Sequence, residues 1–382
     1  MSGPSELPAC AAKVAPQQTL QVPCASIETL PGLGDTVTSL PQSLEVSLDA
    51  AFGADGPGVI CIVGDDAFRE QVRRIRAELL PLALALNRLP EASKDTIRER
   101  GTLNVSNFSE GVDGNRSGLY FHPTTDTPGD SLPEGIVPEP TFYTPNLWPD
   151  EDLPSLRVQA REAAPFLVDV GRRLAAAVDQ RFAEVVPGYR PGTLSKLVGE
   201  PASCNHKCRL ICYREYDSET QRSACKGMWA PPHKDTGLLT ALVPGVFLDA
   251  TSGERLEAGC PDPEVGLYVR DRKGAITQIV APLSDCLFFQ VGEALQIVSG
   301  GQYHATEHCV RGPPRARAGY VRASLAVFFQ PHAHEELPLP AGTSLKDVAE
   351  KAYDGLFRMF LLYQPPDAKG MNFLQFCQRE GF

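Results

Sequence analysis

The sequence predicts an α+β, mainly β protein whose core is a double-stranded β-helix, the cupin-like jelly roll, with flanking helices. From residue 208 to residue 330, short apolar runs alternate with turn signals, as in sheets of short strands. Two stretches with apolar residues at helical spacing precede this region, and one helical stretch follows it. A chain of 382 residues is long enough to bury a large core around these elements.

The overall composition is that of an ordinary globular protein, with 42% hydrophobic and 22% charged residues. A formal net charge of −11 argues against binding to a nucleic-acid backbone, which requires surfaces rich in Lys and Arg. No basic and apolar leader opens the chain, and no run of about 18 apolar residues follows. We therefore expect a cytoplasmic protein, a monomer, with no membrane partner. Its odd number of cysteines, 11, fits no disulfide scaffold.

The first half of the chain is predicted to be rich in helices. Residues 1–20 are expected to form a loose leader, because they are rich in Pro, Ala and Gln without periodicity. In the region 21–200, the β-branched run 58–63 (GVICIV) indicates a buried strand. Asp65 or Asp66 then caps a helix. The apolar face of this helix consists of Phe68, Val72, Ile75 and Leu79.

The segment 101–150 is rich in Gly, Pro, Asn and Asp and is predicted to be a long loop. A second apolar stripe at helical spacing follows, with a kink or restart at Pro165 and an end at 187–188. The stripe consists of Leu167, Val170, Leu174, Val178, Phe182 and Val185.

The region 201–335 is predicted to be the jelly-roll core, with strands near 209–213 and 266–269 and an insertion or enlarged loop at 246–265. The region 336–382 is expected to be a C-terminal helical segment, in which Ser344 caps a helix that extends to about residue 362.

The segment 232–240 (PHKDTGLLT) contains a His-x-Asp motif. Residues two apart on an extended chain point to the same side, so His233 and Asp235 converge on one point. A second imidazole from a distant strand would complete two His and one carboxylate, the facial triad of non-haem Fe(II) oxygenases. The motif alone is weak, because His-x-Asp also occurs by chance.

The segments 289–301 (FQVGEALQIVSGG), 305–308 (ATEH) and 322–324 (RAS) make the motif more specific. With 209–213 (RLICY), they resemble the 2-oxoglutarate/Fe(II)-dependent oxygenases of the isopenicillin N synthase-like superfamily. In that family a Gly-Asp-x-Leu-Gln stretch and a Ser-Asn-Gly turn lead to the third iron ligand, and an Arg-x-Ser follows. The resemblance extends over nearly the whole chain.

This resemblance implies that His233, Asp235 and His308 are the catalytic metal ligands. His304 competes with His308 for the third place, but the spacing from the Ser-Gly-Gly turn favours His308. The two His could otherwise be ordinary loop or core residues.

The resemblance also implies a clamp for the co-substrate 2-oxoglutarate, made of Arg322, Ser324 and Tyr213. A guanidinium forms two parallel bonds with a carboxylate, and a hydroxyl two residues further on faces the same way. The alternative is a structural salt bridge of Arg322. The interval from His308 to Arg322 is longer than usual for the family, and a long hairpin loop at 311–319 would account for the difference.

The implied function is oxidation of a small molecule by Fe(II), 2-oxoglutarate and dioxygen, with release of succinate and CO2. Hydroxylation, desaturation and oxidative cyclisation all remain open. The alternatives are an Fe(II) oxidase of the isopenicillin N synthase or ACC oxidase type, which does not use 2-oxoglutarate, and a binding protein that has lost the chemistry. The loops 101–146 and 246–265 are expected to cover the substrate.

Other His, Cys and basic residues receive ordinary structural interpretations. Three cysteines spaced four apart match no zinc or iron–sulfur pattern and are expected to be small buried hydrophobes; these are Cys204, Cys208 and Cys212. Four histidines are expected at the surface, namely His122, His206, His332 and His334. Four cations are expected on a solvated rim, namely Lys207, Lys226, Arg315 and Arg317.

Overall fold

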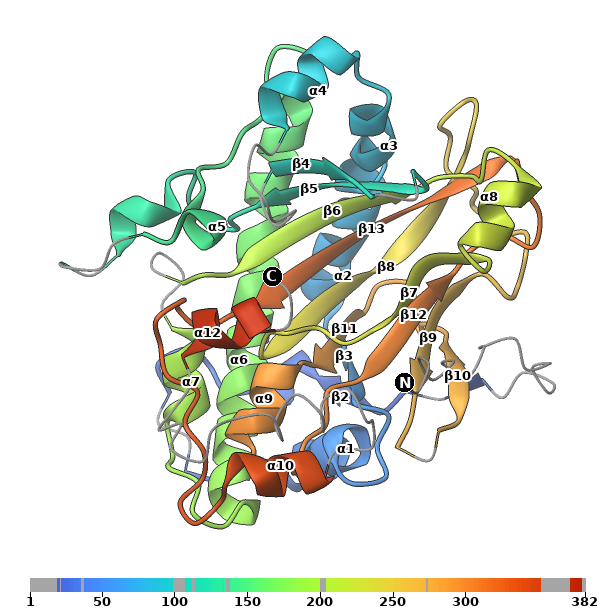
Figure 1. Ribbon diagram of the computed structural model, residues 1–382. Helices are drawn as coiled ribbons and strands as arrows, with labels where there is room; N and C mark the ends of the chain where they lie inside the picture. Colours follow the sequence, from blue (N-terminus) through green and yellow to red (C-terminus); the bar gives the residue numbers. More distant parts are fainter. Residues whose placement is uncertain are drawn as a thin grey trace, which may run out of the picture.

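The computed structural model describes residues 19–20, 22–35, 38–98, 107–111, 114–132, 134, 138–199, 204–272, 274–351 and 372–379. Within these ranges the chain forms an 8-stranded and a 5-stranded sheet, which face each other as the two halves of a jelly roll (Figure 1). The order of the large sheet is β2-β3-β11-β8-β13-β6-β5-β4, and that of the small sheet is β1-β10-β9-β12-β7.

The bounds of the strands are as follows: β1 Thr19–Leu20, β2 Cys24–Ser26, β3 Val59–Val63, β4 Asn107–Glu110, β5 Arg116–Phe121, β6 Lys207–Tyr213, β7 Met228–His233, β8 Leu239–Asp249, β9 Gly266–Arg270, β10 Ile276–Ile279, β11 Leu287–Val291, β12 Glu307–Arg311 and β13 Tyr320–Phe329. The helices are α1 Gln42–Phe52, α2 Asp66–Arg74, α3 Leu82–Asn87, α4 Glu91–Ile97, α5 Pro140–Tyr143, α6 Pro154–Val185, α7 Thr193–Val198, α8 Glu219–Ala224, α9 Glu293–Val298, α10 Leu345–Lys351 and α12 Phe373–Arg379.

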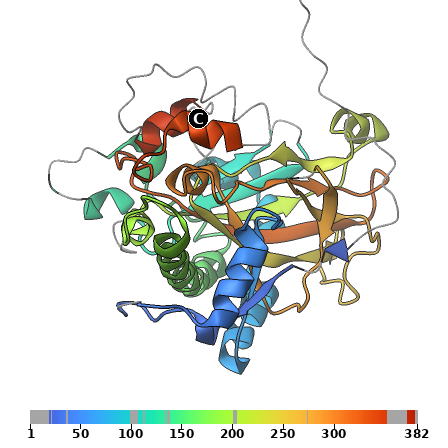
Figure 2. The same ribbon diagram turned by 90° about the horizontal axis from the view of Figure 1, so that it is seen from below.

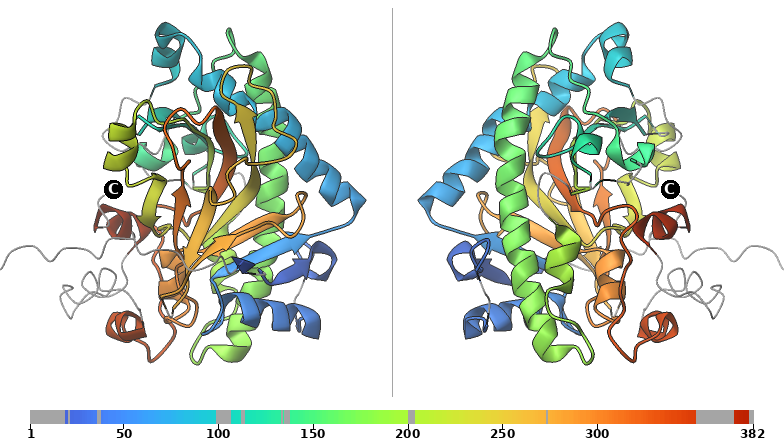
Figure 3. Two further views of the ribbon diagram at one scale, coloured as in Figure 1. Left: turned by 90° about the vertical axis from the view of Figure 1, so that its right-hand side faces the viewer. Right: turned by 90° about the vertical axis from the view of Figure 1, so that its left-hand side faces the viewer.

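Helices cover the outer face of the large sheet. Figures 2 and 3 show α6 running along this face beside α2 and α3, and α6 packs against β8 and β13. As predicted, the side chain of Asp65 caps α2 by accepting a hydrogen bond from the N–H of Phe68. The predicted face of Phe68, Val72, Ile75 and Leu79 is buried. It runs through α2 into the π-helical turn Ile75–Leu79.

Helix α6 is continuous for 32 residues and includes Pro165, so the predicted restart there is wrong. A proline removes only one backbone donor, and here the helix on both sides of it is held against the sheet. Five of the six predicted stripe residues are buried, whereas Val185, the last residue of the helix, is 41% exposed.

Three segments differ from the loops that the sequence predicts. The segment 101–150 contains β4 and β5, which extend the large sheet beyond β6. The first part of the predicted loop 246–265 belongs to β8, which continues to Asp249. Thr19–Leu20, at the end of the predicted leader, pair with β10 as the short parallel strand β1, and the residues before them lie outside the described ranges. β5 pairs with β6, β8 with β13 and β1 with β10, and each of these partners is remote in sequence, so local composition carries no sign of the pairing.

The C-terminal region begins as predicted, because the Ser344 hydroxyl caps α10 by accepting from the N–H of Asp347. The remainder of the predicted helix to residue 362 lies outside the described residues. The division into regions 1–20, 21–200, 201–335 and 336–382 stays a prediction. In the large sheet, strands from 21–200 lie on both sides of a central block of strands from 201–335.

Two general expectations concern the membrane and the cysteines. None of the described helices combines the length and the apolar character that a membrane crossing requires. No disulfide joins the described cysteines.

The close contact between α6 and β13 depends on Gly171. A Cβ atom added at Gly171 would lie 1.9 Å from the Cζ atom of the buried Phe329. We expect Gly171→Ala to lower the free energy of unfolding by about 1–3 kcal/mol through overpacking. This loss should appear in urea titrations even though alanine favours a helix over glycine by about 1 kcal/mol.

The matched control is Val158→Ala, on the exposed side of the same helix. It should change the stability by less than about 0.5 kcal/mol. If the Gly171→Ala protein were more stable than the parent, α6 would have room to move away from Phe329 on β13, and the predicted overpacking would be wrong.

Candidate metal centre

The strands β7 and β12 bring two distant histidines together. They pair antiparallel, and the Cα partner of His233 is His308. Asp235 follows β7 by two residues, and one of its carboxylate oxygens, Oδ1, lies 3.9 Å from the Nε2 atom of each histidine. The three ligand atoms all lie within 4.8 Å of one another. Two imidazoles and one carboxylate at this spacing have the composition and geometry of a facial metal triad.

The turn after β7 is held by the start of α9. The carboxylate of Asp235 accepts a hydrogen bond of 2.6 Å from the Thr240 hydroxyl. Its backbone carbonyl accepts from the N–H of Glu293 at 2.8 Å. A Cβ atom at Gly292 would lie 2.2 Å from the Gly237 carbonyl oxygen, so only glycine permits this approach. Asp235 is therefore fixed before any ligand arrives.

Both histidines present the same ring nitrogen to the carboxylate. The Nδ1 atom of His233 lies 2.8 Å from the carbonyl oxygen of Pro231, and that of His308 lies 3.0 Å from the carbonyl oxygen of Thr306. A carbonyl only accepts, so each Nδ1 carries a proton, and in the neutral imidazole Nε2 is the nitrogen with the free lone pair. Backbone hydrogen bonds of this kind orient the histidine ligands of metals.

The environment also favours the neutral form of His233. Burial and the neighbouring His308 lower the pKa of His233 to about 4, although Asp235 acts in the opposite direction. The imidazole is therefore unprotonated at neutral pH, as coordination requires.

A glycine turn leads the chain from α9 to His308. Gly300 and Gly301 have φ angles of 62° and 77°, a left-handed conformation that favours glycine. The Thr306 hydroxyl then donates to the carbonyl of Gly58 at 2.8 Å, which fastens the start of β12 to the residue before β3. His304 lies before β12 and is not among the three clustered residues.

The clamp residues line the same cavity, which has a volume of about 270 Å³. Arg322 and Ser324 lie two residues apart on β13, and Tyr213 on β6 is the Cα partner of Arg322. The Nη1 atom of Arg322 lies 3.4 Å from the Ser324 hydroxyl, and its guanidinium lies 5.3 Å from the centre of the Tyr213 ring. The structure thus brings together all six predicted site residues.

Two further arginines of this cavity were missed by the sequence analysis. Arg116 on β5 and Arg209 on β6 both line it. Alternation along β6 could have placed Arg209 on the same face as Tyr213. Of the two predicted covering loops, 101–146 contributes Arg116 to the lining, and 246–265 contributes Phe247 and Val265.

The surface prediction is wrong for His122 and His206, both of which are fully buried. Nε2 of His122 donates to the carbonyl of Cys204 at 2.9 Å, and its Nδ1 accepts from the N–H of Thr125 at 3.3 Å. The His122 backbone N–H donates to the side chain of Asn146, 24 residues later. Cys204 and Asn146 are remote in sequence from His122, so the residue pattern gave no sign of the burial.

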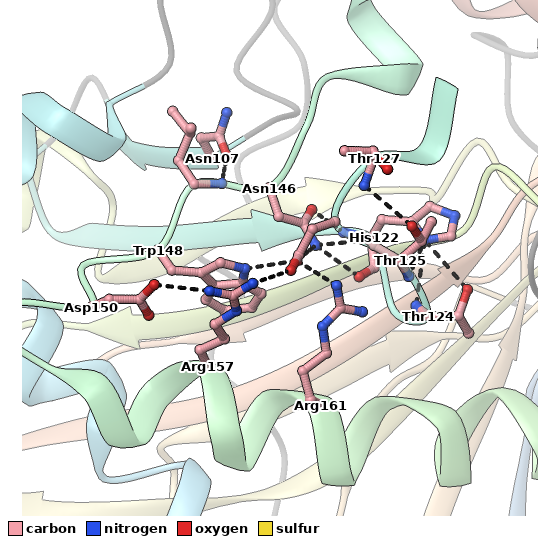
Figure 4. Close-up of polar contacts among 12 residues, drawn as sticks. Asn107, His122, Thr124, Thr125, Thr127, Asn146, Trp148, Asp150, Arg157 and Arg161 are labelled. Atoms are coloured by element: carbon pink, nitrogen blue, oxygen red, sulfur yellow. Dashed lines mark hydrogen bonds and ion pairs between the residues drawn. The ribbon is translucent and has the colours of Figure 1, made fainter. Parts of the chain in front are cut away.

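Figure 4 shows the polar network around His122, into which Trp148, Arg157 and Arg161 also point. Its centre is the Asp126 carboxylate. It accepts from Trp148 Nε1 at 2.8 Å and from Arg157 Nη2 at 2.7 Å, and it forms an ion pair with Arg161. The network ties the segment after β5 to α6.

The remaining histidines, cysteines and cations were predicted with mixed success. His332 is partly buried beside the Tyr143 ring, and His334 is exposed. Cys204, Cys208 and Cys212 are buried, as predicted, and outside the triad the described residues contain no comparable metal-ligand cluster. Lys226, Arg315 and Arg317 are exposed, as predicted, but Lys207 is buried and that prediction is wrong.

Comparison with known proteins identifies the fold. Residues 205–331 match the family model of the 2OG-Fe(II) oxygenase superfamily. No curated protein sequence matches the chain. One similar solved structure is that of a full-length Neurospora crassa protein in complex with alpha-KG and 5-formyluracil (TM-score 0.59, 16% identity, covering 94% of this chain and 95% of that one).

Two further structures are similar over comparable lengths. JOX2 in complex with 2OG, Fe and JA has a TM-score of 0.57 and 19% identity, covering 98% of this chain and 89% of its own. The rice dioxygenase for auxin oxidation has a TM-score of 0.52 and 15% identity, covering 94% of each chain. At such identities the likeness shows a common fold, which confirms the predicted jelly roll.

The matched segment contains the His-Asp-His cluster and the Arg322 strand. The family match over residues 205–331 supports a 2-oxoglutarate- and Fe(II)-dependent dioxygenase. Of the alternatives left open by the sequence, the family match supports this one.

The burial of His122 predicts a pH dependence of stability in the metal-free protein. Burial lowers the pKa of His122 to about 4, whereas an unfolded histidine titrates near 6.5. Between these values the unfolded chain binds the proton and the folded chain does not, so stability falls as the pH falls. We expect His122→Gln to remove about 1 kcal/mol of the loss between pH 7 and pH 5.5.

This difference is measured by urea unfolding of both proteins at each pH, in the presence of a chelator. Any remaining slope should come from groups common to both proteins, including buried His206, whose pKa burial lowers to about 3. Equal slopes would contradict a neutral, buried His122.

Proposed function

We propose that His233, Asp235 and His308 hold the Fe(II), and that Arg322, Ser324 and Tyr213 hold the distal carboxylate of 2-oxoglutarate. The observation that carries the proposal is the orientation of the two imidazoles. Their Nδ1 protons are engaged by backbone carbonyls, so both Nε2 lone pairs are directed to the side of Asp235 Oδ1. If the two histidines were ordinary loop or core residues, this shared orientation would not be required.

The residues present fit the metal and the co-substrate. Two neutral imidazoles and a carboxylate suit Fe(II) and leave coordination positions open. Among the described residues no carboxylate pairs with Arg322, and burial lowers the pKa of its guanidinium. An enclosed guanidinium of this kind is stabilised by an anion, which the 2-oxoglutarate carboxylate supplies.

When bound, the iron supplies the oxidation of a substrate C–H bond, coupled to conversion of 2-oxoglutarate into succinate and CO2. The chain provides position and environment for this reaction. The Thr240 hydroxyl fixes the Asp235 carboxylate, and the paired strands β7 and β12 fix both imidazoles. Apolar residues that include Leu242, Phe288 and Phe328 line the cavity and exclude water from it.

The substrate is proposed to be a small molecule. The cavity lies between the two sheets, and its volume of about 270 Å³ suits a compact ligand. The Neurospora crassa protein and JOX2, which share this fold, were crystallised with 5-formyluracil and JA respectively. Hydroxylation, desaturation and oxidative cyclisation all begin with abstraction of one substrate hydrogen, and the choice depends on how the substrate lies.

The ligand assignment predicts different results for the two nearby histidines. Under anaerobic conditions, 2-oxoglutarate added to the Fe(II)-loaded parent protein should produce the weak visible charge-transfer band of a chelated keto acid. His308→Ala should abolish the band and iron-dependent succinate release, because one of three ligands is lost. His304→Ala, a control only four residues away, should keep both. The reverse pattern would move the third ligand to His304, and retention of both signals in both variants would refute the triad.

The clamp assignment predicts a loss of co-substrate affinity. Arg322→Leu should weaken 2-oxoglutarate binding by about 2–4 kcal/mol, since it removes the partner of an enclosed charge. The same band, followed as a function of 2-oxoglutarate concentration, measures the affinity. Arg315→Leu, on the exposed loop after β12, is the matched control and should bind normally. Unchanged affinity in Arg322→Leu would place the carboxylate elsewhere.

A further inference from the structure

Two arginines face the catalytic cavity without an acidic partner. Arg116 and Arg209 line the same cavity as His233, Asp235 and His308. No hydrogen bond or ion pair joins either guanidinium to the described residues, and the Nε atom of Arg209 is buried and unsatisfied. Arg209 does stack on the ring of Tyr120, at 4.8 Å from its centre. Arg98 and Arg214, in the same part of the fold, both have Glu110 as an ion-pair partner.

The pairing of β5 with β6 places these arginines on one sheet face. The strands β5 and β6 lie side by side in the large sheet (Figure 1). Arg116 is the Cα partner of Tyr213, and Arg209 is the Cα partner of Tyr120. Gly118 lies between Arg116 and Tyr120 on β5. Side chains alternate along a strand, so positions 116, 118 and 120 share the face of Arg209 and Tyr213.

Two glycines provide the space that the arginine side chains occupy. A Cβ atom at Gly118 would lie 3.1 Å from Nε of Arg209. A Cβ atom at Gly111 would lie 2.9 Å from Cγ of Arg116. Each side chain therefore lies over a position where any larger residue would crowd it, which favours a defined orientation of both guanidiniums.

The charges of the cavity leave these two arginines uncompensated once the proposed function is assumed. Asp235 is the one acidic residue among the cavity lining, which also includes three arginines. The negative charge of the distal 2-oxoglutarate carboxylate balances the positive charge of Arg322. The charges of Asp235 and the keto-acid carboxylate together balance the two positive charges of Fe(II). The positive charges of Arg116 and Arg209 remain, and a charge enclosed in protein is costly unless it is paired.

We propose that the substrate is a small organic acid, whose carboxylate is held by Arg116 and Arg209 and whose apolar carbon skeleton extends towards the metal. A guanidinium binds a carboxylate through parallel N–H···O bonds, and two of them lining one cavity favour an acid over a neutral ligand. The remaining lining supplies the apolar contacts, through residues that include Ile211, Leu267, Ile279 and Val310. This inference rests on the proposed function, because it assigns Arg322 to the co-substrate.

The test compares carboxylic acids with their uncharged amides of nearly equal shape. Protein loaded with Fe(II) and 2-oxoglutarate is titrated anaerobically with 3-phenylpropanoate, cyclohexylacetate and octanoate, and with the amide of each, in a calorimeter. We expect at least one acid to bind about ten-fold or more tightly than its amide. Equal affinities in every pair, or no acid binding at about 10 mM, would overturn the proposal. Tighter binding of phenyl phosphate than of any acid would overturn the carboxylate assignment.

Variants connect the preference to the two arginines. Arg116→Leu and Arg209→Leu should each weaken binding of the best acid about ten-fold or more and change binding of its amide less than about three-fold. Arg315→Leu, whose exposed guanidinium pairs with Asp262, should leave both unchanged. An acid preference that survives both cavity substitutions would exclude this site as its origin.

The co-substrate band separates the possible failures. A parent protein without the band would refute the proposed function itself, whereas a parent with the band and no acid preference would refute only the present inference. If a leucine variant loses the band through misfolding, Arg116→Lys and Arg209→Lys replace it. Lysine keeps the charge but not the planar fork, so a smaller loss of acid affinity, still without loss for the amide, is expected.

Discussion

The antiparallel pairing of β7 with β12 is the constraint on which the catalytic cavity depends. It makes two histidines 75 positions apart in the chain direct Cα partners, and the carboxylate of Asp235 follows within one turn. The start of α9 then supports this turn through backbone hydrogen bonds that a side chain at Gly292 would prevent. The proposed metal ligands are thus held by main-chain geometry together with hydrogen bonds of their own side chains.

The large sheet performs a different task. Its inner face carries a row that crosses four strands, from Phe247 through Arg322 and Tyr213 to Arg116. The residues of this row line the cavity opposite the small sheet. Under the proposed function, acids bind to one sheet and the metal binds beside the other, which lets either site change without rebuilding its counterpart.

Local sequence carried enough information for the elements that are stabilised locally. The buried run of β3, the capped helix α2 and the His-x-Asp alternation were all read correctly, because each depends on near neighbours. The strands β4 and β5 were missed, since their Gly- and Asn-rich segment forms a hairpin that joins the sheet only through the pairing of β5 with the remote β6. Pro165 was read as a break, but packing along the sheet keeps α6 continuous.

The same distinction applies to the site. His308 and Arg322 could be assigned through motifs, whereas Arg116 and Arg209 belong to none and become neighbours of the metal only through strand register. The burial of His122 likewise depends on partners about 20 and 80 residues away, Asn146 and Cys204. A pattern of residue types does not predict such contacts, because they form only when the strands are assembled into the sheet.

The interleaving of the large sheet has a consequence for any attempt to isolate the catalytic part. The segment 205–331 that matches the family contains β6 and β11 but neither of their neighbours β5 and β3. Cut out alone, it would expose the backbone donors and acceptors of two apolar strands as open edges, which pair readily with other chains. It would also lose α6, whose removal uncovers the outer face of the sheet. The shortest soluble catalyst that this architecture allows must therefore include strands encoded far upstream of the motif.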